Sequence, residues 1–142
     1  MSNAINIGYT SGIFDLFHIG HLNILRRAKL DCDYLIASVV SDEVAFEVKG
    51  RSPVVPFDER LEIVRAMKPV DAAVGELTTD KMLMWEQLRF ATIYKGDDWK
   101  GTDRGDKLER QFAEVGVRVV YFPYTEHTSS TRLRSIIDDH ED

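Results

Sequence analysis

The fold of this chain is decided by a ten-residue stretch, Gly12-Ile13-Phe14-Asp15-Leu16-Phe17-His18-Ile19-Gly20-His21. An apolar run at residues 5–9 precedes it and predicts a strand, and an amphipathic run at residues 22–30 follows it and predicts a helix. The order is therefore strand, glycine-bearing turn, two histidines and helix. Because the start of a helix exposes unpaired N–H groups and partial positive charge, this order predicts a phosphate site at the histidines.

His18 and His21 are separated by only two residues, one of which is Gly20. Their imidazoles would add side-chain donors to the helix start, and the glycine would let a phosphate approach the backbone closely. The alternatives are a surface or capping histidine, or a pair of metal ligands. With no Cys, Glu or third His nearby, a zinc site is weakly supported. The preceding strand and Gly-x-Phe-Asp turn favour the phosphate interpretation, in which no side chain need act as a nucleophile.

The bulk properties exclude several classes of protein. At 142 residues with a formal net charge of −6, the chain is expected to be one domain, residues 1–142, with neither nucleic acid nor an anionic membrane as its main partner. Residues 1–4 resemble a cloning remnant and are expected to be tag-derived or disordered. Cys32 is the only cysteine, so no intrachain disulfide can form, which suits a reducing cytoplasm. No apolar stretch is long enough to span a membrane, and no signal-peptide core is present, so we expect a cytoplasmic protein without membrane insertion.

Apolar and amphipathic segments alternate along the whole chain. Strands are expected at residues 5–9, 33–40, 71–74, 91–94 and 117–122, and helices at residues 20–30, 57–67, 79–89, 105–114 and 130–139. The third of these helices is expected to be capped by Thr78 or Thr79. This alternation predicts an α/β fold, a Rossmann-like parallel sheet of about five strands with helices on both faces. Since ligands bind such sheets at the carboxyl ends of the strands, the loops there are the candidate sites.

The first candidate loop, residues 41–57, carries Lys49 and Arg51. Arg60 follows on the next expected helix, and Lys68 lies about two turns beyond it, close enough to act on the same face. Any one of these cations alone would be interpreted as solvated charge. Together, in an acidic chain, they are better explained as contacts to anionic substrates.

The second candidate loop is Gly96-Asp97-Asp98-Trp99, directly after an apolar strand. A buried carboxylate there would accept a hydrogen bond from the exocyclic amine of a base such as cytosine, and the indole would offer a flat face. The alternative is a tight turn whose aspartates cap the backbone and whose Trp99 packs on the core. The spacing alone supports the two interpretations equally.

The third candidate loop runs from Pro123 into the last expected helix and contains four consecutive hydroxyl residues, 128–131. One hydroxyl is an ordinary helix cap. Four in succession, with Arg132 and Arg134 in the first turns of the helix, suggest a second phosphate cradle built from N–H and O–H donors.

Together these motifs resemble the signature of the HxGH nucleotidyltransferase superfamily, and they are most similar to those of glycerol-3-phosphate cytidylyltransferases. The resemblance covers nearly the whole chain. Gly-x-Phe-Asp-x-x-His-x-Gly-His stands at residues 12–21 and Gly-Asp-Asp-Trp at 96–99, and Tyr-Thr-Glu-His-Thr-Ser-Ser-Thr at 124–131 resembles the family's Arg-Thr-Glu-Gly-Ile-Ser-Thr-Thr motif. It implies transfer of CMP from CTP to a phosphorylated alcohol, foremost glycerol 3-phosphate, giving CDP-glycerol and pyrophosphate. It also implies Mg²⁺ held mainly through waters by triphosphate oxygens, and a homodimer.

The resemblance also implies roles for single residues. The catalytic group is His18, His21, Asp15 and Lys49, with the histidines serving the α- and β-phosphates. The nucleotide-binding group is Ser11, Gly12, Ile13, Phe14, Gly20, Lys68, Asp71, Gly96, Asp97, Asp98, Trp99, Tyr124, Thr125, Glu126, Ser129, Ser130, Thr131 and Arg132. The acceptor-binding group is Asp42, Arg51, Arg60 and Arg89. No side chain is assigned as a direct metal ligand, and Asp15 either orients the turn or helps to hold the magnesium ion.

Three departures from the family pattern change the charge or bulk of the predicted site. Tyr124 replaces the arginine of the third motif, which removes a fixed positive charge, and His127 replaces its glycine. Leu88 stands where the family has a lysine linked to the acceptor phosphate, and only Arg89 remains basic there. Residues 76–81 also resemble a short insertion.

These departures concern the substrates more than the histidine pair. Phosphoethanolamine, phosphocholine or a sugar phosphate therefore remain alternative acceptors, and ATP remains an alternative nucleotide, although the Gly-Asp-Asp-Trp loop argues against it. A catalytically silent nucleotide-binding module is the alternative from another class of protein, and the intact His18 and His21 argue against it.

Overall fold

Five parallel strands form one sheet in the order β3-β2-β1-β4-β5. The computed structural model describes residues 4–123 and 130–139. The strands are β1 (Ile7–Gly12), β2 (Tyr34–Val40), β3 (Ala72–Glu76), β4 (Thr92–Gly96) and β5 (Arg118–Phe122). The helices are α1 (Ile19–Asp31), α2 (Asp42–Lys49), α3 (Phe57–Arg65), α4 (Lys81–Leu88), α5 (Asp103–Ala113) and α6 (Ser130–Asp139), with a 3₁₀ turn, η1, at Asp97–Trp99.

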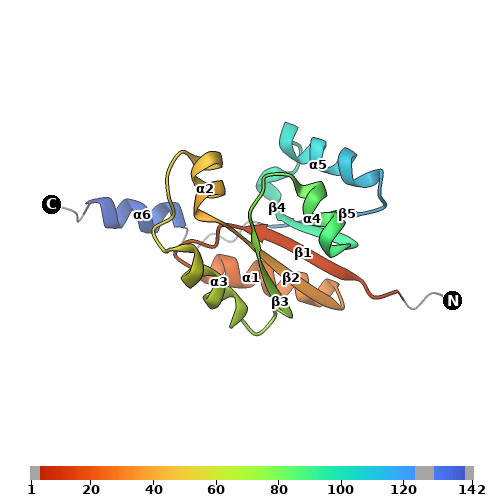
Figure 1. Ribbon diagram of the computed structural model, residues 1–142, viewed down its shortest axis with the longest axis horizontal. Helices are drawn as coiled ribbons and strands as arrows, with labels where there is room; N and C mark the ends of the chain where they lie inside the picture. The colour runs from red at the N-terminus through yellow and green to blue at the C-terminus, as the bar shows by residue number, and fades with distance from the viewer. Residues whose placement is uncertain (1–3, 124–129, 140–142) are drawn as a thin grey trace.

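Helices cover both faces of the sheet. Figure 1 shows α1 and α3 against one face and α2, α4 and α5 on the other, with α6 extending from the end of the sheet at which α1 begins. The predicted Rossmann-like α/β fold is confirmed, because each strand returns to the same direction through a helix. None of the described helices is long and apolar enough to cross a membrane.

The core has two parts, one on each face of the sheet. Leu25 of α1 and Val64 of α3 are fully buried against the first face. Met84 of α4 and Phe112 of α5 pack in the cluster on the second face. Strand β2, which lies between β3 and β1, is buried from its second residue to its last, as expected for a strand covered on both sides.

Every element expected from the sequence is present, with bounds that differ by up to three residues. The largest difference is in β1, which was expected at residues 5–9 and lies at Ile7–Gly12. Its last residues are small or polar, yet Ser11 pairs with Ser38 and Gly12 with Val39 of β2. The backbone ladder extends the strand beyond its apolar part, so its carboxyl end reaches the candidate site.

The expected loop at residues 41–57 is wrong in its first half, because it contains α2. Ser41 caps this helix, its Oγ accepting a hydrogen bond from the N–H of Val44 (3.2 Å), and Gly50 ends it with φ of 78°. Glycine adopts this left-handed conformation at little cost. Only Val44 and Ala45 of the helix are buried, so its apolar pattern is too short to be recognised in the sequence.

Two further expectations at helix ends are wrong. α4 is capped by Asp80, whose Oδ1 accepts from the N–H of Met82 (2.9 Å), rather than by Thr78 or Thr79. α3 ends at Arg65, so Lys68 is not on its face but in the turn that leads into β3.

Part of the third motif lies outside the described residues. This applies to the predictions made for Tyr124, Thr125, Glu126, His127 and Ser129.

Candidate active site

A cavity of about 510 Å³ opens at the carboxyl edge of the sheet. Ser11 and Gly12 line it at the end of β1, Glu76 at the end of β3 and Lys95 near the end of β4. An adjoining hollow of about 320 Å³ is lined by Lys49 and the residues that follow it. The strand ends predicted to carry the site thus meet in one place.

The two histidines cap α1 together. His18 is the N-cap, and its Nδ1 accepts a hydrogen bond from the N–H of Gly20 (3.0 Å). The Nδ1 of His21 accepts from the N–H of His18 (3.2 Å), which completes a reciprocal capping box. Since Nδ1 is the acceptor in both rings, each neutral imidazole carries its proton on Nε2, which remains a donor. The same ring can therefore cap the helix through Nδ1 and offer a hydrogen-bond donor through Nε2.

Burial keeps both imidazoles uncharged. It lowers the pKa of His21 to about 3, and the neighbouring His18 ring adds to this, while Asp15 opposes it. Burial also lowers the pKa of His18. The rings stack with their centroids 4.0 Å apart, and Phe17 lies 5.2 Å from the His21 ring. At neutral pH the helix start thus presents two neutral Nε2–H donors.

The turn between β1 and α1 is strained. Phe14 and Leu16 have φ of 54° and 50°, a left-handed conformation that non-glycine residues rarely adopt. Phe14 is buried, its ring packed beside Gly12, where an added Cβ would meet a Phe14 ring carbon at 3.1 Å. Phe14 also packs beside the His21 ring, and the two ring centroids are 5.5 Å apart.

Asp15 ties three segments together. Only 2% of it is exposed, and its two carboxylate oxygens accept from the N–H groups of Val54 (2.8 Å) and Val55 (2.9 Å). Arg134 of α6 pairs with the same carboxylate at 3.2 Å, and Ser130 Oγ donates to the Asp15 carbonyl at 2.6 Å. Of the two roles open to Asp15, this geometry favours orienting the turn, because both oxygens are engaged by the protein.

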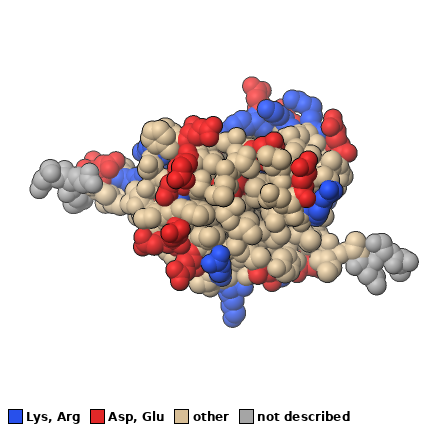
Figure 2. Space-filling view, viewed as in Figure 1, with Lys and Arg blue, Asp and Glu red and all other residues tan. Residues whose placement is uncertain are grey.

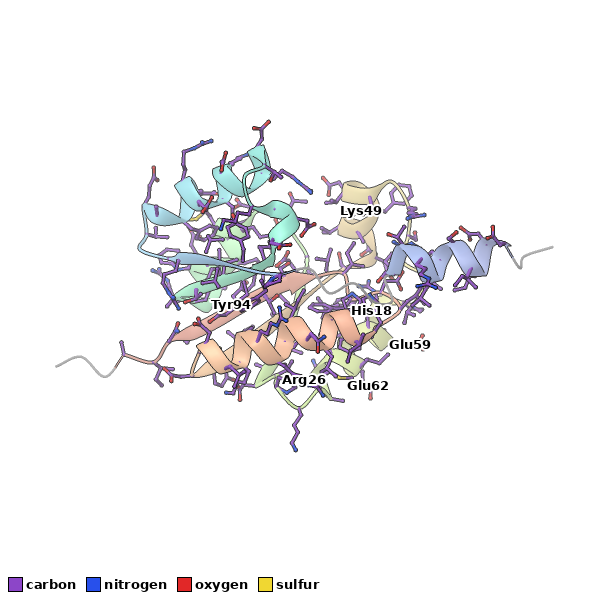
Figure 3. The ribbon with its side chains drawn as sticks, turned by 180° about the vertical axis from the view of Figure 1, so that it is seen from behind. His18, Arg26, Lys49, Glu59, Glu62 and Tyr94 are labelled. Carbon is purple, nitrogen blue, oxygen red and sulfur yellow. The ribbon has the colours of Figure 1, made fainter. Side chains whose placement is uncertain are left out.

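Lys49 lies at the end of α2, at the same end of the sheet as His18 at the start of α1 (Figure 3). Lys49 lines both the cavity and the adjoining hollow, and Arg51 lines the hollow. The cations expected from the first loop therefore flank the histidine site.

Arg60 does not face the cavity. It is 1% exposed, and its guanidinium donates to the carbonyls of Val55 (2.8 Å), Ile13 (2.6 Å) and Val40 (2.7 Å) and to Asp42 Oδ1 (2.7 Å). The predicted acceptor-binding role of Arg60 is corrected here, because its guanidinium is buried and engaged by the protein, whereas the role of its partly exposed partner Asp42 stays a prediction. Together they hold the loops after β1 and β2 and the start of α3.

Glu76 is a buried carboxylate that sequence reasoning missed. It is 1% exposed and accepts from Ser11 Oγ (2.7 Å), Ser38 Oγ (3.0 Å), Tyr9 and Lys81. Burial raises the pKa of Glu76, but the charge of Lys81 and these hydrogen bonds outweigh it and hold the pKa below its ordinary value. The ion pair fixes Lys81 at the cavity. Because residues 76–81 resembled an insertion, no local signal marked this glutamate.

The cytidylyltransferase-like family model matches residues 9–136, which is most of the chain. This chain belongs to the cytidylyltransferase-like family. Two similar relatives are FAD synthases: one from Thermococcus sibiricus, 32% identical over 90% of this chain and 87% of its own length, and one from Pyrococcus abyssi, 32% identical over 89% and 86%. This cytidylyltransferase-like chain is therefore an enzyme, a nucleotidyltransferase of the HxGH superfamily.

Solved structures support the fold. The lipopolysaccharide core biosynthesis protein from Thermoplasma volcanium superposes with a TM-score of 0.73 at 24% identity, covering 88% of this chain and 100% of that one. Pantoate–beta-alanine ligase from Francisella tularensis, solved with beta-gamma ATP and beta-alanine, gives 0.67 at 12% identity, covering 94% and 67%. At these identities the likeness concerns the fold of the cytidylyltransferase-like chain alone.

Three predicted site residues lie at the opposite edge of the sheet of this cytidylyltransferase-like enzyme. Asp71 precedes β3, where its Oδ2 accepts from the N–H of Leu35 (2.8 Å) and from Lys29 (2.7 Å). Lys68 is in the turn just before it, and Arg89 ends α4 next to the start of β4, with its guanidinium over the Trp85 ring at 4.2 Å. A five-residue strand spans about 16 Å. Within one chain, these residues are therefore too far from the cavity to contact a nucleotide there.

The Gly-Asp-Asp-Trp loop of this cytidylyltransferase-like enzyme forms η1 at the cavity rim. Asp98 and Trp99 line the cavity, and an added Cβ on Gly96 would meet Asp98 Oδ1 at 2.7 Å. Trp99 also packs against the core cluster of α4 and α5. The tight turn and the packed Trp99 of the second interpretation are confirmed, although no aspartate side chain caps η1. The expected buried carboxylate is wrong, because Asp97 and Asp98 are both exposed, and base binding by this loop stays a prediction.

Proposed function

We propose that this nucleotidyltransferase transfers the nucleotidyl group of a nucleoside triphosphate to the phosphate of a phosphorylated alcohol and releases pyrophosphate. The observation that carries the proposal is the pair of Nε2–H donors of His18 and His21 at the start of α1, beside a cavity lined with cations. A helix start with fixed donors suits phosphate oxygens and supplies no nucleophile of its own.

In the proposed reaction an oxygen of the acceptor phosphate attacks the α-phosphorus in line, and the bond from that phosphorus to the pyrophosphate oxygen breaks. The attacking phosphate is anionic near neutral pH, so no strong base is required. His18 and His21 stabilise the charge that develops on the α- and β-phosphate oxygens, and Lys49 neutralises the two anionic substrates. The protein contributes orientation and fixed donors rather than a covalent intermediate.

Magnesium is part of the proposal. No group of three or more His, Cys, Asp or Glu side chains able to hold a metal ion occurs in residues 4–123 and 130–139. The residues present fit an ion held mainly by the triphosphate and water, since both oxygens of Asp15 are engaged by the protein. When bound, the ion would neutralise triphosphate charge.

We propose two pairs of substrates, in order of preference. The family resemblance of residues 12–21 and 96–99 favours CTP and glycerol 3-phosphate. The second candidate is ATP with FMN, because two similar relatives are FAD synthases and FAD consists of FMN joined to AMP. Cytosine and adenine both carry an exocyclic amine that a carboxylate such as Asp98 accepts from, so this contact alone is compatible with either base.

A panel assay of pyrophosphate release tests the proposal. CTP and ATP are each combined with glycerol 3-phosphate, phosphoethanolamine, phosphocholine, a sugar phosphate and FMN, with and without excess chelator. We expect the fastest release with CTP and glycerol 3-phosphate, and none with chelator. Faster release with ATP and FMN would establish the second candidate. Nucleotide binding without pyrophosphate release from any pair would identify a silent binding module.

We also propose that the chain acts as a cytoplasmic homodimer built from a single domain. Apolar side chains are exposed on helices that contribute residues to the cavity, including Phe46 and Val48 of α2 and Ile137 of α6, at 56%, 54% and 38%. Light scattering at micromolar concentration should give twice the mass of one chain, 16.2 kDa. A mass of one chain would contradict the dimer and leave the proposed chemistry untouched.

A further inference from the structure

Positive charge exceeds negative charge among the described residues that line the cavity. The cations are Lys49, Lys81, Lys95, Arg104 and Arg134, and the carboxylates are Asp15, Glu76 and Asp98. Two of the carboxylates are paired, Asp15 with Arg134 and Glu76 with Lys81. The excess lies in a protein whose formal net charge is −6, so it is a local feature of the cavity.

Two of the excess cations lie against one indole. Lys95 Nζ is 4.0 Å from the centroid of the Trp99 ring, and the guanidinium carbon of Arg104 is 4.4 Å from it. Neither forms an ion pair with a carboxylate within residues 4–123 and 130–139. Figure 2 shows further Lys and Arg side chains gathered over α5, the helix that carries Arg104.

The cations of the cavity repel one another in this arrangement. Burial lowers the pKa of Lys95 to about 8, and repulsion from Lys81 and Arg104 adds to this, while Glu76 and Asp98 oppose it. An anion bound in the cavity beside these two cations would relieve the repulsion. A cationic ligand would increase it, and the indole face that could receive a quaternary ammonium already contacts cations.

On the basis of the proposed function, we propose that Lys95 and Arg104, held on Trp99, form the subsite that binds the anionic acceptor. This subsite selects phosphorylated alcohols without a positive charge, such as polyol phosphates, and disfavours phosphocholine and phosphoethanolamine. It also changes the role expected of Trp99, from a platform for the base to a support for two acceptor-binding cations.

Steady-state kinetics on Lys95→Met test the subsite. We expect the KM for glycerol 3-phosphate to rise about tenfold or more, with a smaller change in the KM for the nucleotide, because a charge-assisted contact is lost on one substrate only. The ratio of kcat/KM for glycerol 3-phosphate to kcat/KM for phosphocholine should fall in Lys95→Met. Lys107→Met is the matched control, since Lys107 is exposed on α5 and does not line the cavity. An unchanged acceptor KM in Lys95→Met would overturn the proposal.

The pH dependence of acceptor affinity distinguishes an effect of the Lys95 charge from an effect of its side-chain packing. As pH rises through about 8, Lys95 loses its proton, so acceptor affinity should fall between pH 7 and 9. The acceptor phosphate loses its second proton near pH 6 and is already dianionic over this range. In Lys95→Arg the cation persists, so the fall should disappear. An equal fall in the wild type and in Lys95→Arg would contradict the proposal.

A binding measurement keeps the inference independent of catalysis. The chain has two tryptophans, so Trp85→Phe leaves Trp99 as the sole indole reporter of its own subsite. Titration with glycerol 3-phosphate should change its fluorescence, glycerol should not, and Arg104→Gln should weaken the response about tenfold. Such binding without turnover would support the subsite while refuting the proposed reaction. Normal turnover with no effect of Arg104→Gln or Lys95→Met would refute the subsite alone.

Discussion

Replacing either His18 or His21 with alanine is expected to lower turnover about 100- to 1000-fold, because each substitution removes one preorganised donor from the phosphate site. The donors are preorganised since each Nδ1 is already bonded to the backbone, at 3.0 Å and 3.2 Å, which leaves Nε2–H as the free donor of each ring. Initial rates of pyrophosphate release at saturating substrates measure the effect.

The capping role of these histidines requires a control. His18→Ala also removes an N-cap, which typically costs about 1 kcal/mol of stability. His18→Asn supplies a good N-cap but has no imidazole Nε2, so it should restore the melting temperature and not the rate. If His18→Asn or either alanine variant turned over at the wild-type rate, the phosphate-site interpretation would be wrong.

Arg60→Ala is expected to destabilise the fold by about 3–5 kcal/mol, because it leaves three carbonyls and Asp42 without the guanidinium that pairs them. Arg60→Lys should recover only part of this, since an ammonium cannot reach four acceptors in a planar fork. Urea denaturation followed by circular dichroism measures the free energy of unfolding.

Arg65→Ala is the matched control for Arg60, because Arg65 is an exposed arginine on the same helix and should change stability by less than about 0.5 kcal/mol. An Arg60→Ala variant with wild-type stability and a raised KM for the acceptor would restore the acceptor-binding role that the structure takes from this residue.

The fold could be predicted from the sequence because its signals are local. A strand covered on both faces, such as β2, is a continuous apolar run, and Pro69 after α3 limits how far that helix can extend. The histidine site was predictable for the same reason: His18, Gly20 and His21 are neighbours in the chain, and their chemistry depends on one helix start.

The rest of the site depends on contacts that no local pattern records. Arg60 on α3 and Lys95 on β4 are both cationic side chains, yet Arg60 bonds to backbone carbonyls and Lys95 lines the cavity. Glu76 pairs with the nearby Lys81, but its serine partners lie 65 and 38 residues away along the chain, on β1 and β2. Lys68 lies near the start of β3, away from the cavity, because α3 carries the chain back along the sheet between two parallel strands.

The contacts of Asp15 restrict how homologous sequences can diverge. Ser130 and Val54 meet this one residue from 115 and 39 positions away. A substitution in α6 therefore changes the environment of a turn near the other end of the chain, and a length change after Gly50 displaces the N–H groups that the carboxylate accepts from. Among relatives, the turn that carries Asp15, the segment after Gly50 and α6 should therefore vary together. In chimaeras that exchange only α6, the side chains that contact Asp15 should no longer match it.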